Sequence, residues 1–155
     1  MIGILALHGG VEEHEAVLDS LGLPYKRVRS LEDTTELSGL IIPGGESTVM
    51  KMFLGKYGLE KWIQSFDGPI YGTCAGMIVL ASLGLLDAEV ERNAYGRQLN
   101  SFVTELTSEF GPVRAHFIRA PKVNWCGDEV EVLMEHEGVP VLIRQGNVWA
   151  SSFHP

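Results

Sequence analysis

Three short apolar runs in the first half of the chain each end in a glycine-containing turn. They cover residues 2–7, 39–42 and 69–71. A segment with helical spacing follows each turn, and runs that are apolar throughout are typical of parallel strands buried on both faces. Strands that alternate with helices predict an α/β fold with a doubly wound, mostly parallel sheet. In such sheets ligands lie beyond the carboxyl ends of the strands, where all three turns would meet.

The second half of the chain has few helical segments, and we expect it to add antiparallel strands to the sheet. The strands predicted there cover residues 102–106, 113–118, 129–134, 139–144 and 148–153. The first half is predicted to hold helices over 12–21, from 47 onward and over 77–81, and a further strand over 25–29. Because the sequence shows no internal repeat or linker, we expect one domain over residues 1–155.

The composition argues against several classes of function. Twenty acidic against 12 basic residues give a formal charge of −8, which repels phosphate backbones and anionic lipids, so neither nucleic acid nor membrane is an expected partner. No apolar run approaches about 18 residues, and the first residues lack the basic flank of a signal peptide. Cys74 and Cys126 lie in dissimilar contexts without a CxxC partner, which predicts a cytoplasmic protein and no metal site. Cys126 follows Trp125 in a predicted loop, and we assign it no role.

The segment Gly72-Thr73-Cys74-Ala75-Gly76 has the form G-x-nucleophile-x-G of a nucleophile elbow. Its glycines would tolerate a sharp strand-to-helix turn that projects the cysteine above the sheet. The unpaired N–H groups and dipole at the start of the next helix favour a thiolate, so we expect the pKa of Cys74 to lie below its usual value of about 8.5. The alternative is a buried cysteine with a structural role.

Acyl transfer also requires donors for an oxyanion and a base for the thiol. The backbone N–H groups of Ala75 and Gly45 are the expected donors, since both follow strand ends at the same edge. Among the five histidines, His154 is best placed as the base because it ends a predicted strand and can approach Cys74. The alternatives are an ordinary glycine turn with Ser47 as helix cap, and a packed or surface histidine.

Three motifs together resemble the class I, triad-type glutamine amidotransferases, which have a flavodoxin-like architecture. They are Pro43-Gly44-Gly45-Glu46-Ser47-Thr48, the elbow around Cys74, and Ser152-Phe153-His154-Pro155. Residues 90–98, 117–121 and 144–147 more narrowly resemble the glutaminase subunits of pyridoxal 5'-phosphate synthases. These segments span nearly the whole chain.

The resemblance implies that Cys74 is the nucleophile and His154 the general base. It implies substrate contacts at Gly45, Glu46, Ser47, Arg92, Ile118 and Arg119. An arginine suits the α-carboxylate of glutamine because its planar fork donates paired, charge-assisted hydrogen bonds. Glu46 is expected either to meet the substrate's ammonium group or to stabilise the start of the helix.

The implied reaction is hydrolysis of L-glutamine to L-glutamate and ammonia through a thioester on Cys74. The resemblance further implies that ammonia passes to a separate pyridoxal 5'-phosphate synthase subunit for vitamin B6 biosynthesis. No cofactor and no metal is implied. The alternative hypotheses are a non-catalytic or impaired binding subunit of the same complex, an amidotransferase subunit of another synthase, and a cysteine hydrolase or stress protein with another substrate.

The sequence departs from the family pattern most clearly at its end and at His8. The family continues beyond the position of Pro155 with a glutamate that completes the triad and with a final helix, so we expect the C-terminal end of the pattern to be missing from residues 1–155. Loss of the corresponding acid in a serine triad lowers the rate by about 10⁴. His8 stands where the family commonly has glutamine, near the oxyanion loop.

Overall fold

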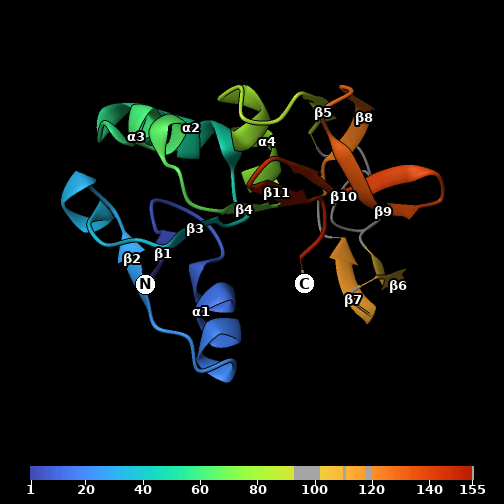
Figure 1. The fold of residues 1–155 in the computed structure, drawn as a ribbon, viewed down its shortest axis with the longest axis horizontal. Coiled ribbons are helices and arrows are strands. Elements are labelled where there is room, and N and C mark those ends of the chain that lie inside the picture. Colours follow the sequence, from blue (N-terminus) through green and yellow to red (C-terminus); the bar gives the residue numbers. More distant parts are fainter. Residues whose placement is uncertain (93–101, 110, 118–119, 155) are drawn as a thin grey trace.

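The computed structural model describes residues 1–92, 102–109, 111–117 and 120–154. A seven-stranded sheet runs through its centre (Figure 1). In spatial order its strands are β2 (Tyr25–Val28), β1 (Ile2–Leu5), β3 (Gly39–Ile42), β4 (Ile70–Thr73), β11 (Val148–Ser151), β10 (Val139–Gln145) and β9 (Glu131–His136). The first five are parallel and the last two are antiparallel to their neighbours. The predicted α/β class and mostly parallel sheet are therefore confirmed.

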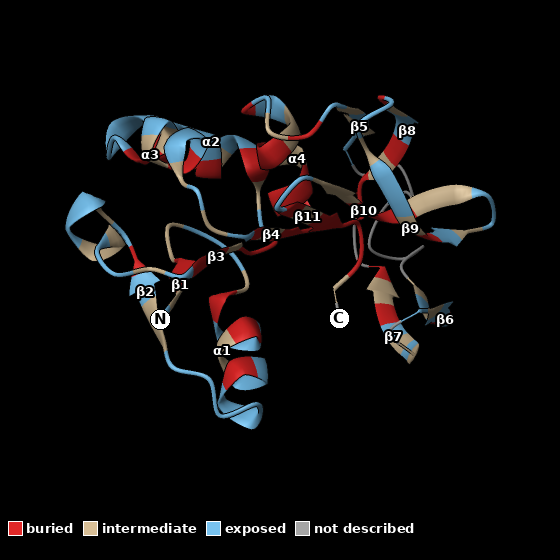
Figure 2. Ribbon diagram, viewed as in Figure 1, coloured by how far each residue is buried: buried red, intermediate tan, exposed pale blue. Residues whose placement is uncertain are grey.

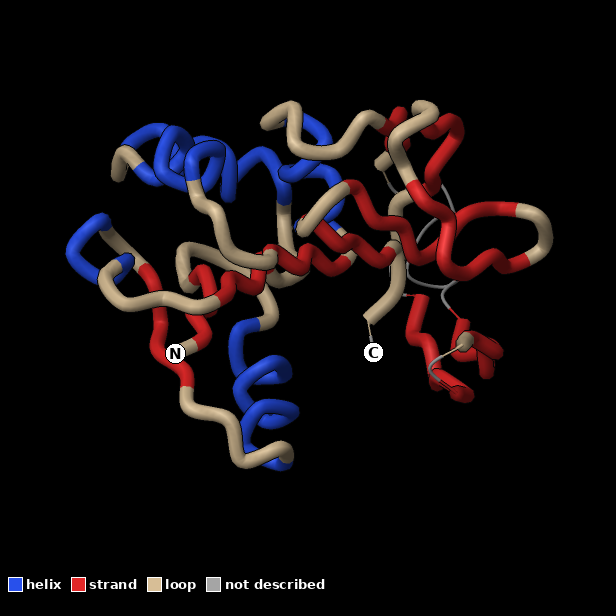
Figure 3. The backbone as a smooth tube through the Cα atoms, viewed as in Figure 1, coloured by secondary structure: helices blue, strands red, loops and turns tan. Residues whose placement is uncertain are grey.

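Helices cover both faces of the sheet, as a doubly wound fold requires. The helices are α1 (Val11–Ser20), α2 (Ser47–Lys56), α3 (Leu59–Ser65) and α4 (Ala75–Ser82). Figure 3 shows α1 on one side of the strands and the other three helices on the opposite side. A short 3-10 turn, Leu31–Thr34, follows β2. None of the described helices is long and apolar enough to cross a membrane.

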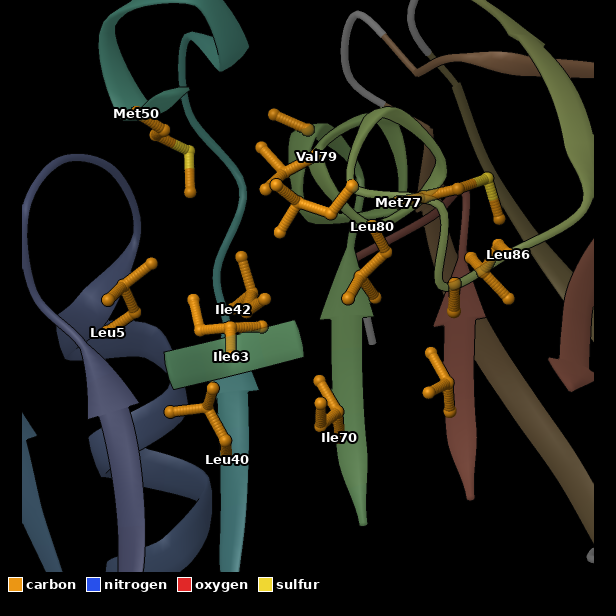
Figure 4. Packing of buried hydrophobic residues seen from close by; sticks show 14 of the residues in the cluster. Leu5, Leu40, Ile42, Met50, Ile63, Ile70, Met77, Val79, Leu80 and Leu86 are labelled. Atoms are coloured by element: carbon orange, nitrogen blue, oxygen red, sulfur yellow. The ribbon is translucent and has the colours of Figure 1, made fainter. Parts of the chain in front are cut away.

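Two of the three buried clusters lie on the two faces of the parallel strands. The larger one joins the sheet to the helical layer formed by α2, α3 and α4, with Ile42, Met50 and Leu80 among its fully buried members (Figure 4). The smaller one joins Ile4 of β1 to Val11 and Leu18 of α1. Because side chains alternate along a strand, neighbouring apolar residues serve opposite faces, which is why these strands are apolar throughout. Figure 2 shows the buried band along the sheet.

Two small antiparallel sheets flank the central one. They pair β5 (Ala88–Glu91) with β8 (Lys122–Cys126), and β6 (Phe102–Ser108) with β7 (Gly111–Phe117). The expected antiparallel additions are confirmed, with one correction: β11 is antiparallel to β10 but parallel to β4, so it joins the two halves of the sheet.

Among the described residues, the sequence did not predict α3, β5, β8 or the 3-10 turn. Cys126, expected in a loop, is the last residue of β8. In β5 the partly buried residues alternate with exposed Glu89 and Glu91, and a strand of four residues offers too short a pattern to recognise. The pairing with β8 supplies the hydrogen bonds that such a segment cannot form alone.

Candidate active site

Cys74 lies between the last residue of β4 and the first residue of α4, in an unusual backbone conformation. Its φ is 53° and its ψ is −111°, a region that residues with a side chain rarely adopt. Two backbone hydrogen bonds hold the turn: the Cys74 N–H donates to the Ser151 carbonyl at 2.8 Å, and the Met77 N–H donates to the Cys74 carbonyl at 3.0 Å. Such conformations persist where surrounding structure determines them, and they cluster at functional sites.

The two glycines of the elbow are required by close contacts. A Cβ atom on Gly76 would lie 2.2 Å from the carbonyl oxygen of Ile42, and one on Gly72 would lie 2.6 Å from Leu80 Cδ1. The first contact is with backbone, which cannot move aside as a side chain can. Tight packing of α4 against β3 and β4 therefore accounts for the G-x-C-x-G pattern in steric terms.

His154 follows β11, the strand next to β4, and two backbone hydrogen bonds of 2.9 Å pair it with His116. Gly44, after β3, lies between this histidine and the cysteine. A Cβ atom on Gly44 would be 2.4 Å from Cε1 of the His154 ring and 3.3 Å from Cβ of Cys74. The structure thus brings the three sequence motifs together at one edge of the sheet.

The loop before α1 packs against the diglycine loop. The Gly10 N–H donates to the Gly44 carbonyl at 2.9 Å. A Cβ atom on Gly45 would lie 2.9 Å from Gly9 Cα and 3.0 Å from Cδ2 of His8. The imidazole of His8 therefore lies beside Gly45, the residue predicted to provide one oxyanion donor.

Burial dominates the electrostatics of the candidate nucleophile. It raises the pKa of Cys74 to about 11, opposed by a hydrogen bond from the Ala75 backbone N–H. The expected lowering of this pKa is therefore wrong. The residue is only 6% exposed, and the thiolate loses more hydration than one N–H group at the start of α4 restores.

Burial also lowers the pKa of His154 below its ordinary value of 6.5, with an opposing contribution from Glu13 and a further lowering by His116. Near neutral pH the pair is therefore a thiol and a neutral imidazole. An imidazole in this form can accept a proton, as a general base must.

Glu46 and Arg92 meet at the start of α2. The Glu46 carboxylate accepts a hydrogen bond of 2.8 Å from the Val49 N–H, which is the main cause of its lowered pKa, and it forms an ion pair with Arg92. Arg92 also donates to Thr48 Oγ1 at 3.0 Å. Glu46, not Ser47, caps the helix, because Ser47 is already its first residue and is buried.

Two predicted substrate contacts, Ile118 and Arg119, lie outside the described residues, as do residues 93–98 of the segment that contains Arg92. Gly45, Glu46, Ser47 and Arg92 are described, and the last three positions lie together around the start of α2. The substrate-binding roles of all six residues stay predictions.

Sequence reasoning missed two hydrogen bonds that support the edge of the sheet. His14 Nε2 lies 3.0 Å from Thr73 Oγ1, and the Tyr71 hydroxyl lies 2.9 Å from Ser151 Oγ. The spacing of Val11, His14 and Leu18 on one buried stripe of α1 was the available signal for the first. This spacing puts His14 at a position of the helix where an apolar residue would be expected.

The arrangement defines a class of protein: α/β proteins with a cysteine at a strained strand-to-helix turn, faced by a histidine and a diglycine loop. Within this class the chain belongs to the SNO glutamine amidotransferase family, whose sequence pattern it matches over residues 4–155.

Individual relatives agree with this assignment. "Pyridoxal 5'-phosphate synthase subunit PdxT" of Francisella philomiragia is 47% identical over 160 residues, covering 99% of this chain and 89% of that protein. The protein of the same name from Kosmotoga olearia is 45% identical over 170 residues, covering 99% and 88%.

Solved structures extend the comparison to the fold. A crystal structure of a glutamine amidotransferase superposes with a TM-score of 0.93 at 43% identity, covering 99% of this chain and 89% of that one. A glutamine amidotransferase from Thermotoga maritima shares the fold, with a TM-score of 0.68 at 17% identity and coverage of 99% and 75%.

Proposed function

We propose that this chain is the glutaminase subunit of a pyridoxal 5'-phosphate synthase. It hydrolyses L-glutamine to L-glutamate and ammonia, and it passes the ammonia to a synthase subunit that builds pyridoxal 5'-phosphate. Relatives of that name match 99% of the chain at 45% and 47% identity, which supports the particular complex. The proposal includes one glutamine amidotransferase domain over residues 1–155 and a cytoplasmic location, where a thiol nucleophile stays reduced.

One observation carries the catalytic part of the proposal. Cys74 and His154 follow adjacent parallel strands, and both contact the space that a side chain on Gly44 would occupy. A nucleophile, a base and a diglycine loop at one sheet edge are elements that attack on a carboxamide requires.

The first half of the reaction forms a thioester. His154 accepts the thiol proton while the sulfur of Cys74 adds to the side-chain carboxamide carbon of glutamine. Because only about one thiol in 10⁴ would be ionised at pH 7 with a pKa of about 11, proton transfer to the imidazole has to accompany the attack. The carboxamide oxygen becomes an oxyanion, for which the N–H groups of Ala75 and Gly45 are the proposed donors.

The second half releases both products. The tetrahedral intermediate collapses, the carbon–nitrogen bond breaks, and His154 returns its proton to the departing ammonia. Water then adds to the thioester carbon as His154 accepts its proton. Collapse of this second intermediate expels the sulfur of Cys74, which recovers a proton from the imidazole, and L-glutamate leaves.

The residues around the start of α2 are the proposed recognition site for the free amino acid. Arg92 is a candidate for the α-carboxylate, and its ion pair with Glu46 holds the guanidinium over this end of the helix. Glu46 has a second candidate role toward the substrate's ammonium group. Gly45, Ser47, Ile118 and Arg119 complete the proposed contacts.

The test measures glutamate release by the full protein together with its synthase subunit. The unsubstituted chain is expected to release glutamate, and Cys74→Ala is expected to lose this activity. Cys126→Ala provides the matched control, since it changes the other cysteine in the same way. A diazoketone analogue of glutamine should form a stable adduct on Cys74, detected by mass spectrometry.

Equal glutamate release by the unsubstituted chain and by Cys74→Ala would exclude the proposed mechanism. A chain that assembles with the synthase subunit but neither releases glutamate nor captures the analogue would instead be a binding subunit.

A further inference from the structure

A buried histidine outside the proposed mechanism contacts the strand that carries the nucleophile. His14, in the middle of α1, is 9% exposed, and its Nε2 lies 3.0 Å from the hydroxyl oxygen of Thr73. Thr73 is fully buried and immediately precedes Cys74. The contact therefore joins α1, from the face opposite α4, to the residue before the elbow.

Each partner of this contact needs the other. A buried hydroxyl or imidazole without a hydrogen bond destabilises the folded state, and this pair satisfies both groups. Burial, with a further contribution from His154, lowers the pKa of His14, whereas Glu13 raises it. The neutral imidazole can either accept the Thr73 proton or donate its own, depending on its tautomer.

The elbow needs support on this side. Cys74 has an unusual backbone conformation. Two backbone hydrogen bonds stabilise it, one to Ser151 of β11 and one from Met77 of α4. On the side of α1, the hydrogen bond between His14 and the Thr73 side chain holds the residue before Cys74. At the start of the same helix, the Gly10 N–H holds the carbonyl of Gly44 at 2.9 Å. Helix α1 thus contacts both the elbow and the diglycine loop.

We propose that His14 is a positioning residue for Cys74, acting through the hydroxyl of Thr73. The hydrogen bond fixes the end of β4 relative to α1 and so sets the direction in which the sulfur faces His154 and the substrate carbon. The inference rests on the proposed function, because it assigns His14 to the same reaction. Misplacement of a reacting group by about 1 Å can lower a rate roughly 100-fold.

The experiment measures capture of the diazoketone glutamine analogue by the full protein in complex with its synthase subunit. Thr73→Val removes the hydroxyl at nearly constant volume, and His14→Leu removes the imidazole with a residue that suits a buried helix face. Each is expected to lower the capture rate at saturation by roughly 10- to 100-fold, with the half-saturating concentration changed less than about twofold.

Two further variants separate positioning from a general loss of structure. The double variant is expected to be no slower than the slower single variant, because both substitutions remove one hydrogen bond. Thr73→Ser keeps the hydroxyl and is expected to restore most of the rate lost in Thr73→Val. Thr107→Val, the same change at an exposed position of β6, is the matched control.

The possible failures are distinguishable. Wild-type capture rates in folded Thr73→Val would overturn the inference and leave the proposed function intact. Additive losses in the double variant, or a Thr73→Ser variant as slow as Thr73→Val, would overturn it as well. No capture by the unsubstituted chain would reject the proposed function itself.

Discussion

The two cysteines lie in contrasting parts of the molecule. Cys74 is nearly buried at a strained turn, beside Gly44 and His154. Cys126 is partly exposed at the end of β8, where its backbone pairs regularly with Ala88. Burial raises the pKa of both thiols, and Asp87 adds to the increase at Cys126. A lowered thiol pKa therefore does not mark the candidate nucleophile, whereas a base at the same sheet edge does.

The largest predicted effect in this comparison comes from removing the proposed base, His154. His154→Asn removes the proton acceptor but keeps a polar side chain, so glutamate release with the synthase subunit is expected to fall by about 10² to 10⁴. The control is His136→Asn, because the ring of His136 stacks on Phe117 with centroids 5.7 Å apart and has no proposed catalytic role. Equal losses in the two variants would mean that His154 contributes only to packing.

A matched pair of glycines provides the second prediction. A Cβ atom on Gly76 would lie 2.2 Å from the Ile42 carbonyl, whereas one on Gly127, next to Cys126, would lie 1.9 Å from the carboxylate of Asp87. Backbone cannot move aside, but the end of a side chain can. Gly76→Ala is therefore expected to lower the free energy of unfolding by about 1–3 kcal/mol, and Gly127→Ala by less than about 1 kcal/mol.

Denaturant unfolding monitored by circular dichroism gives both free energies, provided that the slope against denaturant stays constant between variants. A larger loss in Gly127→Ala than in Gly76→Ala would show that β3 and α4 adjust easily, against the steric account of the elbow.

The contrast between the two regions also explains what could be predicted from the sequence. Around Cys74 the strands are apolar throughout and end in glycine turns, so the parallel sheet and the edge where the motifs meet followed from local patterns. Around Cys126 the short strands β5 and β8 depend on pairing between segments distant in the sequence. No local pattern specifies such a pairing, and Cys126 was wrongly expected in a loop.

The electrostatics of the site are the property that the local sequence predicts least well. The start of α4 favours a thiolate, and this was the only contribution visible in the sequence. The opposing cost of burial depends on how β3, β4 and α4 enclose the sulfur, which only the assembled structure shows. The hydrogen bond between His14 and Thr73 was missed for a similar reason, since it joins residues 59 positions apart.

A third prediction concerns the intrinsic reactivity of the two thiols in the protein without substrate. Iodoacetamide needs an accessible thiolate, and Cys74 is nearly buried with a pKa of about 11. Cys126 is expected to be alkylated about tenfold faster, as mass spectrometry of timed samples would measure. The diazoketone analogue of glutamine is expected to reverse this order, because it delivers the electrophile to the site of His154. Preferential alkylation of Cys74 by iodoacetamide would indicate a preformed thiolate.

The smallest predicted effect is a pH dependence of stability that arises on the Cys74 side of the molecule. Burial lowers the pKa of both His14 and His154 below 6.5. Well above pH 6.5 both imidazoles are neutral in the folded and the unfolded chain, so the free energy of unfolding does not depend on their titration. As the pH falls below 6.5, the unfolded chain binds protons first, so the free energy of unfolding decreases until the pH passes below the folded pKa values.

Denaturant unfolding at pH values from 7.5 to 5 measures this slope. The carboxylates of Glu15, Asp33 and Glu46 do not contribute to this slope, since their pKa values are lowered in the folded chain. His14→Gln keeps a hydrogen-bonding group near Thr73 but cannot titrate, so its stability should decrease less over this range. Cys126→Ser should retain the full slope. Equal losses of stability in His14→Gln and in the unsubstituted chain would mean that burial does not keep the imidazole of His14 neutral. The hydrogen bond between His14 and Thr73 would then have to form with a charged imidazole as well.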